Sequence, residues 1–143
     1  SSFDVVLNLF NSLGYMDEQQ NRAVLTETAR CLKPGGRFML ETRNKKYQIL
    51  FAPHHGQVEM SSGDPATVRS SYNRQTSRLD TVWTNPEDED EVYHTASIRL
   101  YAPREIEDML DESGLSVDAR LGTYGGDRFQ GFERQLIYVC TRE

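Results

Sequence analysis

The order of three patterns in the first 42 residues is the strongest constraint on the fold of this 143-residue chain. The run Phe3 to Phe10 is almost continuously apolar, which is typical of a strand buried on both faces of a parallel sheet. Residues 17 to 32 carry apolar side chains at helical spacing, and Asp17 with Gln20 forms a capping-box pattern. A second apolar run covers residues 37 to 42. Strand, helix and strand in this order predict a βαβ unit with two parallel strands.

The middle of the chain has a different character. Three β-like stretches cover residues 67 to 73, 78 to 84 and 92 to 101, and the last of them alternates well. Since such stretches joined by short turns are typical of antiparallel pairing, residues 45 to 101 are expected to form a β-rich insertion or lid. The acidic run 86 to 91 is interpreted as a solvated hairpin tip rather than a metal site.

A helix and two strands are expected to complete the chain. Pro103 suits the first position of a helix and Gly114 suits its end. Strands are predicted at about 116 to 124 and 134 to 141. The fold class is therefore α/β, with parallel strands and an antiparallel β insertion.

Composition excludes several classes of function. Sixteen Lys and Arg against 22 Asp and Glu give a net charge of −6, which argues against general nucleic-acid binding. Cys31 and Cys140 have no metal-type spacing and provide no disulfide scaffold, so a reducing cytoplasm fits best. No apolar run approaches the ~20 residues that span a bilayer. We expect no metal site, no membrane association and a cytoplasmic location.

Four local patterns together resemble a known family. The segment from Cys31 to Phe38 contains a Leu-Lys-Pro-Gly-Gly turn, and the segment from Phe3 to Val6 matches the strand that precedes this turn in that family. Arg99 to Tyr101 with the following helix, and Gln135 to Val139, match its last helix and last strand. In order, they resemble the C-terminal half of a class I S-adenosylmethionine-dependent methyltransferase. The resemblance implies a partial Rossmann-like sheet of parallel strands with one reversed strand, and residues 1 to 143 as the C-terminal part of such a domain.

One element of that family is missing from the sequence. The family binds its cofactor mainly through a glycine-rich loop between a strand and a helix. Gly35-Gly36 lies on a helix-to-strand turn and Gly125-Gly126 lies between two strands, so neither has the required context. We therefore expect a fragment, with S-adenosylmethionine held mainly by residues outside this chain, upstream or on another chain.

The resemblance also nominates site residues at the end of the first strand. Asn8, Leu9 and Phe10 are the cofactor-side candidates, and Asn11 and Tyr15 are the acceptor-side candidates. Ligands of open α/β sheets bind beyond the carboxyl ends of the strands, where these residues are expected. The alternative is that Leu9 and Phe10 are core residues and that Asn11 belongs to a simple turn.

The end of the second strand carries Arg43 and Asn44. Together with Asn11-Ser12 they resemble small-molecule N-methyltransferases of the glycine and sarcosine type, in which the arginine binds the acceptor carboxylate. Arg99 and Tyr101 are further acceptor candidates if the insertion forms a lid, although packing is the commoner use of such residues. No side chain stands out as a catalytic base.

The functional hypothesis is methyl transfer from S-adenosylmethionine to a small-molecule, polar acceptor. The alternative is a non-catalytic methyltransferase-like binding or accessory subunit. The opening strand is expected to leave one edge unpaired, and bare apolar edges pair with other chains. We therefore expect self-association, or a partner chain, along that edge.

Overall fold

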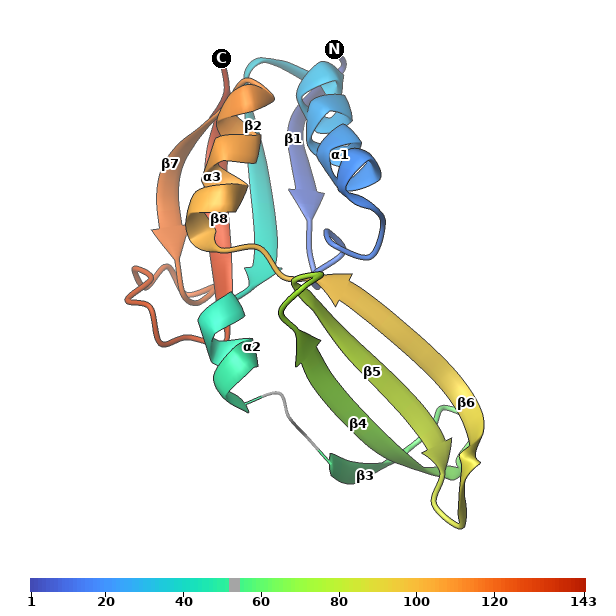
Figure 1. The fold of residues 1–143 in the computed structure, drawn as a ribbon. Helices are drawn as coiled ribbons and strands as arrows, with labels where there is room; N and C mark the ends of the chain where they lie inside the picture. The colour runs from blue at the N-terminus through green and yellow to red at the C-terminus, as the bar shows by residue number, and fades with distance from the viewer. Residues whose placement is uncertain (52–54) are drawn as a thin grey trace.

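The structure is a computed structural model that describes residues 1–51 and 55–143. Its first sheet has the order β1 (Phe3–Asn8), β2 (Leu32–Arg43), β8 (Gln135–Arg142) and β7 (Leu115–Leu121). β1 and β2 are parallel, whereas β8 is antiparallel to both of its neighbours. Figure 1 shows this sheet in the upper part of the molecule. The predicted fold class, with parallel strands and one reversed strand, is confirmed.

Two helices cover one face of this sheet. They are α1 (Glu18–Cys31) and α3 (Pro103–Glu112), and both lie in front of the strands in Figure 1. The capping box predicted from Asp17 and Gln20 is formed at the start of α1. The main core lies between helices and strands, and its fully buried members include Leu25, Phe38, Leu40, Leu110 and Tyr138.

The opening strand differs from its prediction in one respect. Its backbone pairs with β2 and its other edge is unpaired, both as expected, but one of its two faces is uncovered. Phe3, Val5 and Leu7 are 56%, 56% and 57% exposed, because they alternate with Val6, which packs against the core beneath α1. The expectation of burial on both faces was therefore wrong for the described residues. Only one face of β1 is covered.

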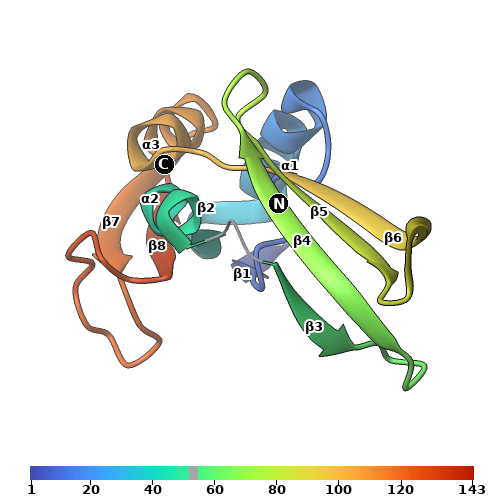
Figure 2. The same ribbon diagram turned by 60° about the horizontal axis from the view of Figure 1, so that its bottom comes forward.

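The predicted antiparallel insertion forms a second sheet, with the order β3 (His55–Glu59), β4 (Pro65–Asn73), β5 (Arg78–Asn85) and β6 (Asp88–Arg99). Its strands pair antiparallel throughout. β3 was not predicted, because its sequence is short and polar. The buried apolar cluster that belongs to this sheet is small: Leu79, Ile98 and Leu100, with Tyr72 packed against it. Figure 2 shows the second sheet projecting away from the first.

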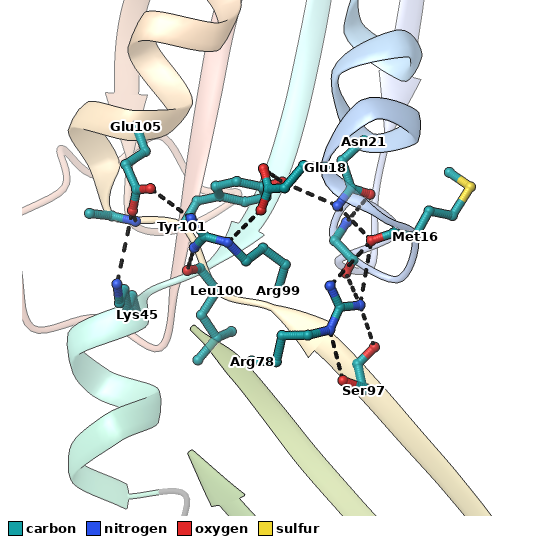
Figure 3. A network of polar contacts seen from close by, with 12 residues as sticks. Met16, Glu18, Asn21, Lys45, Arg78, Ser97, Arg99, Leu100, Tyr101 and Glu105 are labelled. Carbon is teal, nitrogen blue, oxygen red and sulfur yellow. Dashed lines mark hydrogen bonds and ion pairs between the residues drawn. The ribbon is translucent and has the colours of Figure 1, made fainter. Parts of the chain in front are cut away.

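The loop after β1 joins the two sheets. The backbone N–H of Arg99 donates to the carbonyl of Gly14 at 2.8 Å. Gly14 has φ +116°, and a Cβ there would lie 2.6 Å from the carbonyl oxygen of Arg99, so the close approach requires glycine. The guanidinium of Arg78 donates to the carbonyls of Gly14, Tyr15 and Met16 (Figure 3). These contacts fix the second sheet beyond the carboxyl ends of β1 and β2.

The seven-residue helix α2 (Lys45–Phe51) follows β2 almost directly. It lies between the two sheets in Figure 1. Across residues 1–51 and 55–143, no helix is long and apolar enough to cross a membrane.

Candidate functional site

A cleft of about 460 Å³ lies between α2 and the second sheet. One wall is formed by side chains of α2, namely Tyr47, Gln48 and Phe51. The rings of Tyr47 and Phe51 are 4.5 Å apart between centroids and are tilted by 39°. Gln48 is only 8% exposed. This wall therefore presents two aromatic rings and one buried carboxamide.

The opposite wall is one face of β4, β5 and β6. Its large side chains are Val68, Leu79, Trp83 and Ile98. They share one face because Val68 is paired with Trp83 and Leu79 with Ile98 in the antiparallel register. The predicted alternation of the third β stretch is what places Ile98 on this face. One face of the insertion thus forms a wall of the cleft.

Tyr15 and Arg43 both contribute to this cleft, although they are 28 positions apart in the sequence. Tyr15 lies in the loop after β1, and Arg43 is the last residue of β2. The structure therefore brings together two of the predicted acceptor-side residues at the carboxyl ends of parallel strands. Arg134, immediately before β8, also lines the cleft and was missed by sequence reasoning. No local pattern distinguishes it from a solvated arginine.

Asn44 supports the backbone segment that precedes β8. It is 4% exposed, and its carboxamide donates to the carbonyls of Gly131 and Glu133 at 3.1 and 2.7 Å. Its backbone N–H donates to the carbonyl of Arg134 at 3.0 Å. Asn44 therefore holds the segment that carries Arg134, and the recorded contacts of its side chain lie outside the cleft lining.

The end of β1 has an unusual backbone. Phe10 and Asn11 are consecutive non-glycine residues in the left-handed region, with φ of 59° and 57°. The Phe10 N–H donates to the carboxylate of Glu41 at 2.7 Å, and Glu41 is 3% exposed. The phenol of Tyr124 donates to the other oxygen of that carboxylate. Desolvation and this hydrogen bond raise the pKa of Tyr124 to about 12. Glu41 thus fixes a backbone turn that would otherwise be strained.

The turn leaves hydrogen-bonding capacity unused. The side-chain oxygens of Asn8 and Asn11 are buried and have no partner among the described residues. Phe10 presents a ring that is 82% exposed, and the carbonyl of Leu9 accepts from the Ser12 hydroxyl at 2.7 Å. Buried acceptors without donors suit a ligand that brings N–H or O–H groups. Of the predicted cofactor-side residues, Asn8 therefore offers an acceptor and Phe10 an exposed side chain to a ligand, whereas the sequence provides no glycine-rich strand-to-helix turn.

Arg99 and Tyr101 lie in a different environment from the one expected of acceptor-binding residues. The Arg99 guanidinium donates to Glu18 at 2.6 Å and to Glu105 at 2.8 Å, and it lies 4.3 Å from the ring centroid of Tyr101. The Tyr101 phenol donates to Glu18 at 3.0 Å and accepts from Asn21 at 3.1 Å. Figure 3 shows these groups directed toward one another between α1 and α3. Neither residue lines the cleft.

The pKa shifts of Arg99 and Tyr101 agree with side chains that are engaged with one another and with their neighbours. Burial would lower the pKa of Arg99, but its hydrogen bonds to Glu105 and Glu18 outweigh burial and raise it. Burial raises the pKa of Tyr101 to about 12; the hydrogen bond from Asn21 opposes this shift and the charge of Glu18 adds to it. Both groups therefore keep their usual charge near neutral pH and serve the junction of β6 with the helices.

A larger trough of about 760 Å³ lies mainly on the opposite face of the second sheet. Most of its lining residues are of polar types, His55 among them, and two of its charged groups already have partners. Arg69 contacts Glu89 at 2.5 Å, and Asp80 accepts from Ser97 at 2.7 Å. No described residue of the β1 or β2 ends lines it. We therefore assign the candidate site to the cleft.

The described ranges, 1–51 and 55–143, contain no group of three or more His, Cys, Asp or Glu side chains able to hold a metal ion. His54, one half of the His54-His55 pair, lies outside the described residues. Cys31 and Cys140 are free thiols.

Comparison with solved structures shows the fold. The CcbJ methyltransferase from Streptomyces caelestis matches with a TM-score of 0.80 at 20% identity, over 99% of this chain and 58% of that one. An S-adenosylmethionine-dependent methyltransferase from Clostridium acetobutylicum matches with a TM-score of 0.77 at 14% identity, over the same shares of the two chains. CalS10 from Micromonospora echinaspora is an amino pentose methyltransferase solved with S-adenosylmethionine bound. It matches with a TM-score of 0.65 at 16% identity, over 99% of this chain and 59% of that one.

These matches establish an S-adenosylmethionine-dependent methyltransferase fold across the whole chain. The chain spans somewhat more than half the length of the structures it matches. No family model and no curated protein matches the sequence.

Proposed function

We propose that this chain forms the acceptor-binding part of an S-adenosylmethionine-dependent methyltransferase that acts on a small-molecule amine. The observation that carries the proposal is the cleft at the carboxyl ends of β1 and β2, which Tyr15 and Arg43 line together. The structural likeness to methyltransferases supports the reaction type. A further similar structure, the sugar N-methyltransferase KedS8 from a Streptoalloteichus species (TM-score 0.61, 18% identity), supports nitrogen as the methylated atom.

When bound, S-adenosylmethionine supplies an electrophilic methyl group. Asn8, Leu9 and Phe10 would hold its near side, through the unpaired Asn8 carboxamide and the exposed Phe10 ring. Glu41 would keep these groups in place by holding the Phe10 N–H. The remaining contacts must come from residues outside this chain.

Arg43 would bind an anionic group of the acceptor, because a guanidinium matches a carboxylate or phosphate with two parallel donors. Tyr15 would close the cleft on the side of the β1 loop. Rate enhancement in such a site comes from holding the nucleophile near the methyl group rather than from a side-chain base. An amine needs only to arrive deprotonated.

The alternative is a non-catalytic accessory subunit. The missing glycine-rich turn and the free backbone edge of β1 favour pairing with a further strand in either case. We propose that this edge accepts a strand of the remaining methyltransferase fold, from the same protein or a partner.

The test is methyl transfer by the protein encoded by the whole gene, with labelled S-adenosylmethionine and a panel of amines. We expect Arg43→Gln to raise KM about tenfold and to leave kcat within about twofold, since it removes a contact made equally before and during reaction. Arg104→Gln, an exposed arginine on α3, is the matched control. Binding of S-adenosylhomocysteine without any methyl transfer would favour the accessory subunit, and absence of both would overturn the proposal.

A further inference from the structure

The two walls of the cleft share an aromatic character. On α2 the Tyr47 and Phe51 rings contact each other at a tilt of 39°, and on β5 the Trp83 ring centroid lies 5.1 Å from that of the His94 imidazole. Tyr47, Phe51 and Trp83 all line the cavity between α2 and the sheet. Aromatic faces on both sides of a cleft favour a planar ring between them, through stacking and burial of apolar area.

The charge of the lining is entirely of one sign. Arg43 and Arg134 are its charged residues, and the described lining contains no Asp or Glu. Both arginines line the same cleft, and Arg134 directly precedes Gln135, the residue paired with Arg43 across β2 and β8. Within the described part of the chain, neither guanidinium forms an ion pair. In a chain with a net charge of −6, two neighbouring uncompensated cations mark a place for an anion.

The wall of α2 also carries a polar group suited to a ligand. Gln48 lines the cleft and is 8% exposed, yet its carboxamide has no hydrogen bond to a described residue. By contrast, the hydroxyls of Ser70 and Thr81 on the sheet wall already bond each other at 2.9 Å. A carboxamide in the cleft lining offers both a donor and an acceptor to a polar substituent of a bound molecule.

Resting on the proposed function above, we infer that the methyl acceptor is an amphipathic anion, with a planar ring joined to a carboxylate or phosphate ester. The ring lies between Trp83 and the α2 aromatic pair, and the anion lies at Arg43 and Arg134. The volume of about 460 Å³ falls in the range of roughly 300–1,000 Å³ that holds a multi-ring or drug-sized ligand. An amino acid as small as glycine would leave most of it unfilled.

The experiment measures binding to the 143-residue chain alone, without any methyl donor. The probes are 4-iodobenzoate and 4-iodophenyl phosphate, with 4-iodobenzamide as the uncharged ring and glycine as the ringless anion. Affinity comes from calorimetry. The position of the bound probe is tested by heavy-atom quenching of the fluorescence of Trp83, the one tryptophan of the chain. The variants are Arg43→Gln, Arg134→Gln and Arg104→Gln, of which the last removes an exposed charge outside the cleft.

We expect at least one anionic ring to bind and quench Trp83. Arg43→Gln and Arg134→Gln should each weaken it about fivefold, as expected for a partly exposed charge-assisted contact, while Arg104→Gln changes it less than about twofold. Tighter binding of the phosphate or of the carboxylate identifies the anion. The inference is overturned if the benzamide or glycine binds as well as the anionic rings, if neither anionic ring binds, or if the cleft variants behave like Arg104→Gln.

These outcomes are independent of catalysis. Arginine-dependent binding of the probes, together with no methyl transfer by the whole protein, would reject the proposed reaction and keep the ligand class. Methyl transfer by the whole protein without binding of the anionic rings would keep the proposed reaction and reject the ligand class.

Discussion

The two sheets are stabilised by different kinds of interaction. The first sheet is packed beneath α1 and α3, with an apolar core that includes Leu25, Phe38 and Leu110. The second sheet buries Leu79, Ile98 and Leu100, and much of its attachment is polar, through Arg78 and the Arg99 network. The cleft lies where they meet. Its shape therefore depends on hydrogen bonds and ion pairs more than on the apolar core.

The largest effect should come from the first core. Leu110→Ala removes a side chain with no exposed surface from between α3 and the sheet, and we expect a loss of about 3–5 kcal/mol in the free energy of unfolding. Leu79→Ala, in the smaller cluster, should cost about 2 kcal/mol because its surroundings can relax more easily. Urea denaturation measures both values. Equal losses would contradict the contrast between the sheets.

The polar junction should respond to loss of Arg99, whose side chain is only 13% exposed. Arg99→Ala leaves Glu18 and Glu105 without their partner, and we expect a loss of about 2 kcal/mol. Arg22→Ala is the matched control: its ion pair with Glu112 is half-exposed, so its loss should cost about 0.2–1 kcal/mol. Urea denaturation, with Trp83 fluorescence as a probe of the cleft, measures the difference. If Arg99→Ala cost no more than the control, the junction would not depend on this network.

The same contrast explains what the sequence could and could not predict. The βαβ unit, the capping box at Asp17 and the helix at Pro103 depend on patterns within a few residues of one another, so they were predicted correctly. The exposure of Phe3, Val5 and Leu7 depends on what packs on the other face of the sheet, and no local pattern shows that.

The candidate site was only partly predictable for the same reason. Tyr15 and Arg43 follow strands, where the general rule for α/β sheets directs attention. Trp83 and Arg134 reach the cleft only through the tertiary arrangement of the second sheet and β8. Arg99 and Tyr101 were candidates on the hypothesis that the insertion forms a lid, but Glu18, which binds both residues, is 81 positions away from Arg99.

The smallest effect should be a change in alkaline stability at Tyr101, on the first-sheet side of the junction. Burial chiefly raises the pKa of Tyr101 in the folded protein to about 12, whereas the pKa of a tyrosine in the unfolded chain is about 10. Below pH 10 both states are neutral, so the stabilising effect is fully present. As the pH rises from about 10 to about 12, the unfolded chain loses its proton first, and stability falls.

Tyr101→Phe removes that titration together with the hydrogen bonds to Glu18 and Asn21. At pH 7 we expect the variant to lose about 1 kcal/mol, because Asn21 and Glu18 lose a partner. Between pH 10 and 12 its stability should decline less steeply than that of the wild type, so that the two curves converge. Urea denaturation at half-unit steps of pH measures the convergence. Parallel curves would mean that the Tyr101 phenol is not protected from ionisation, and that water reaches the junction which sets the position of the second sheet.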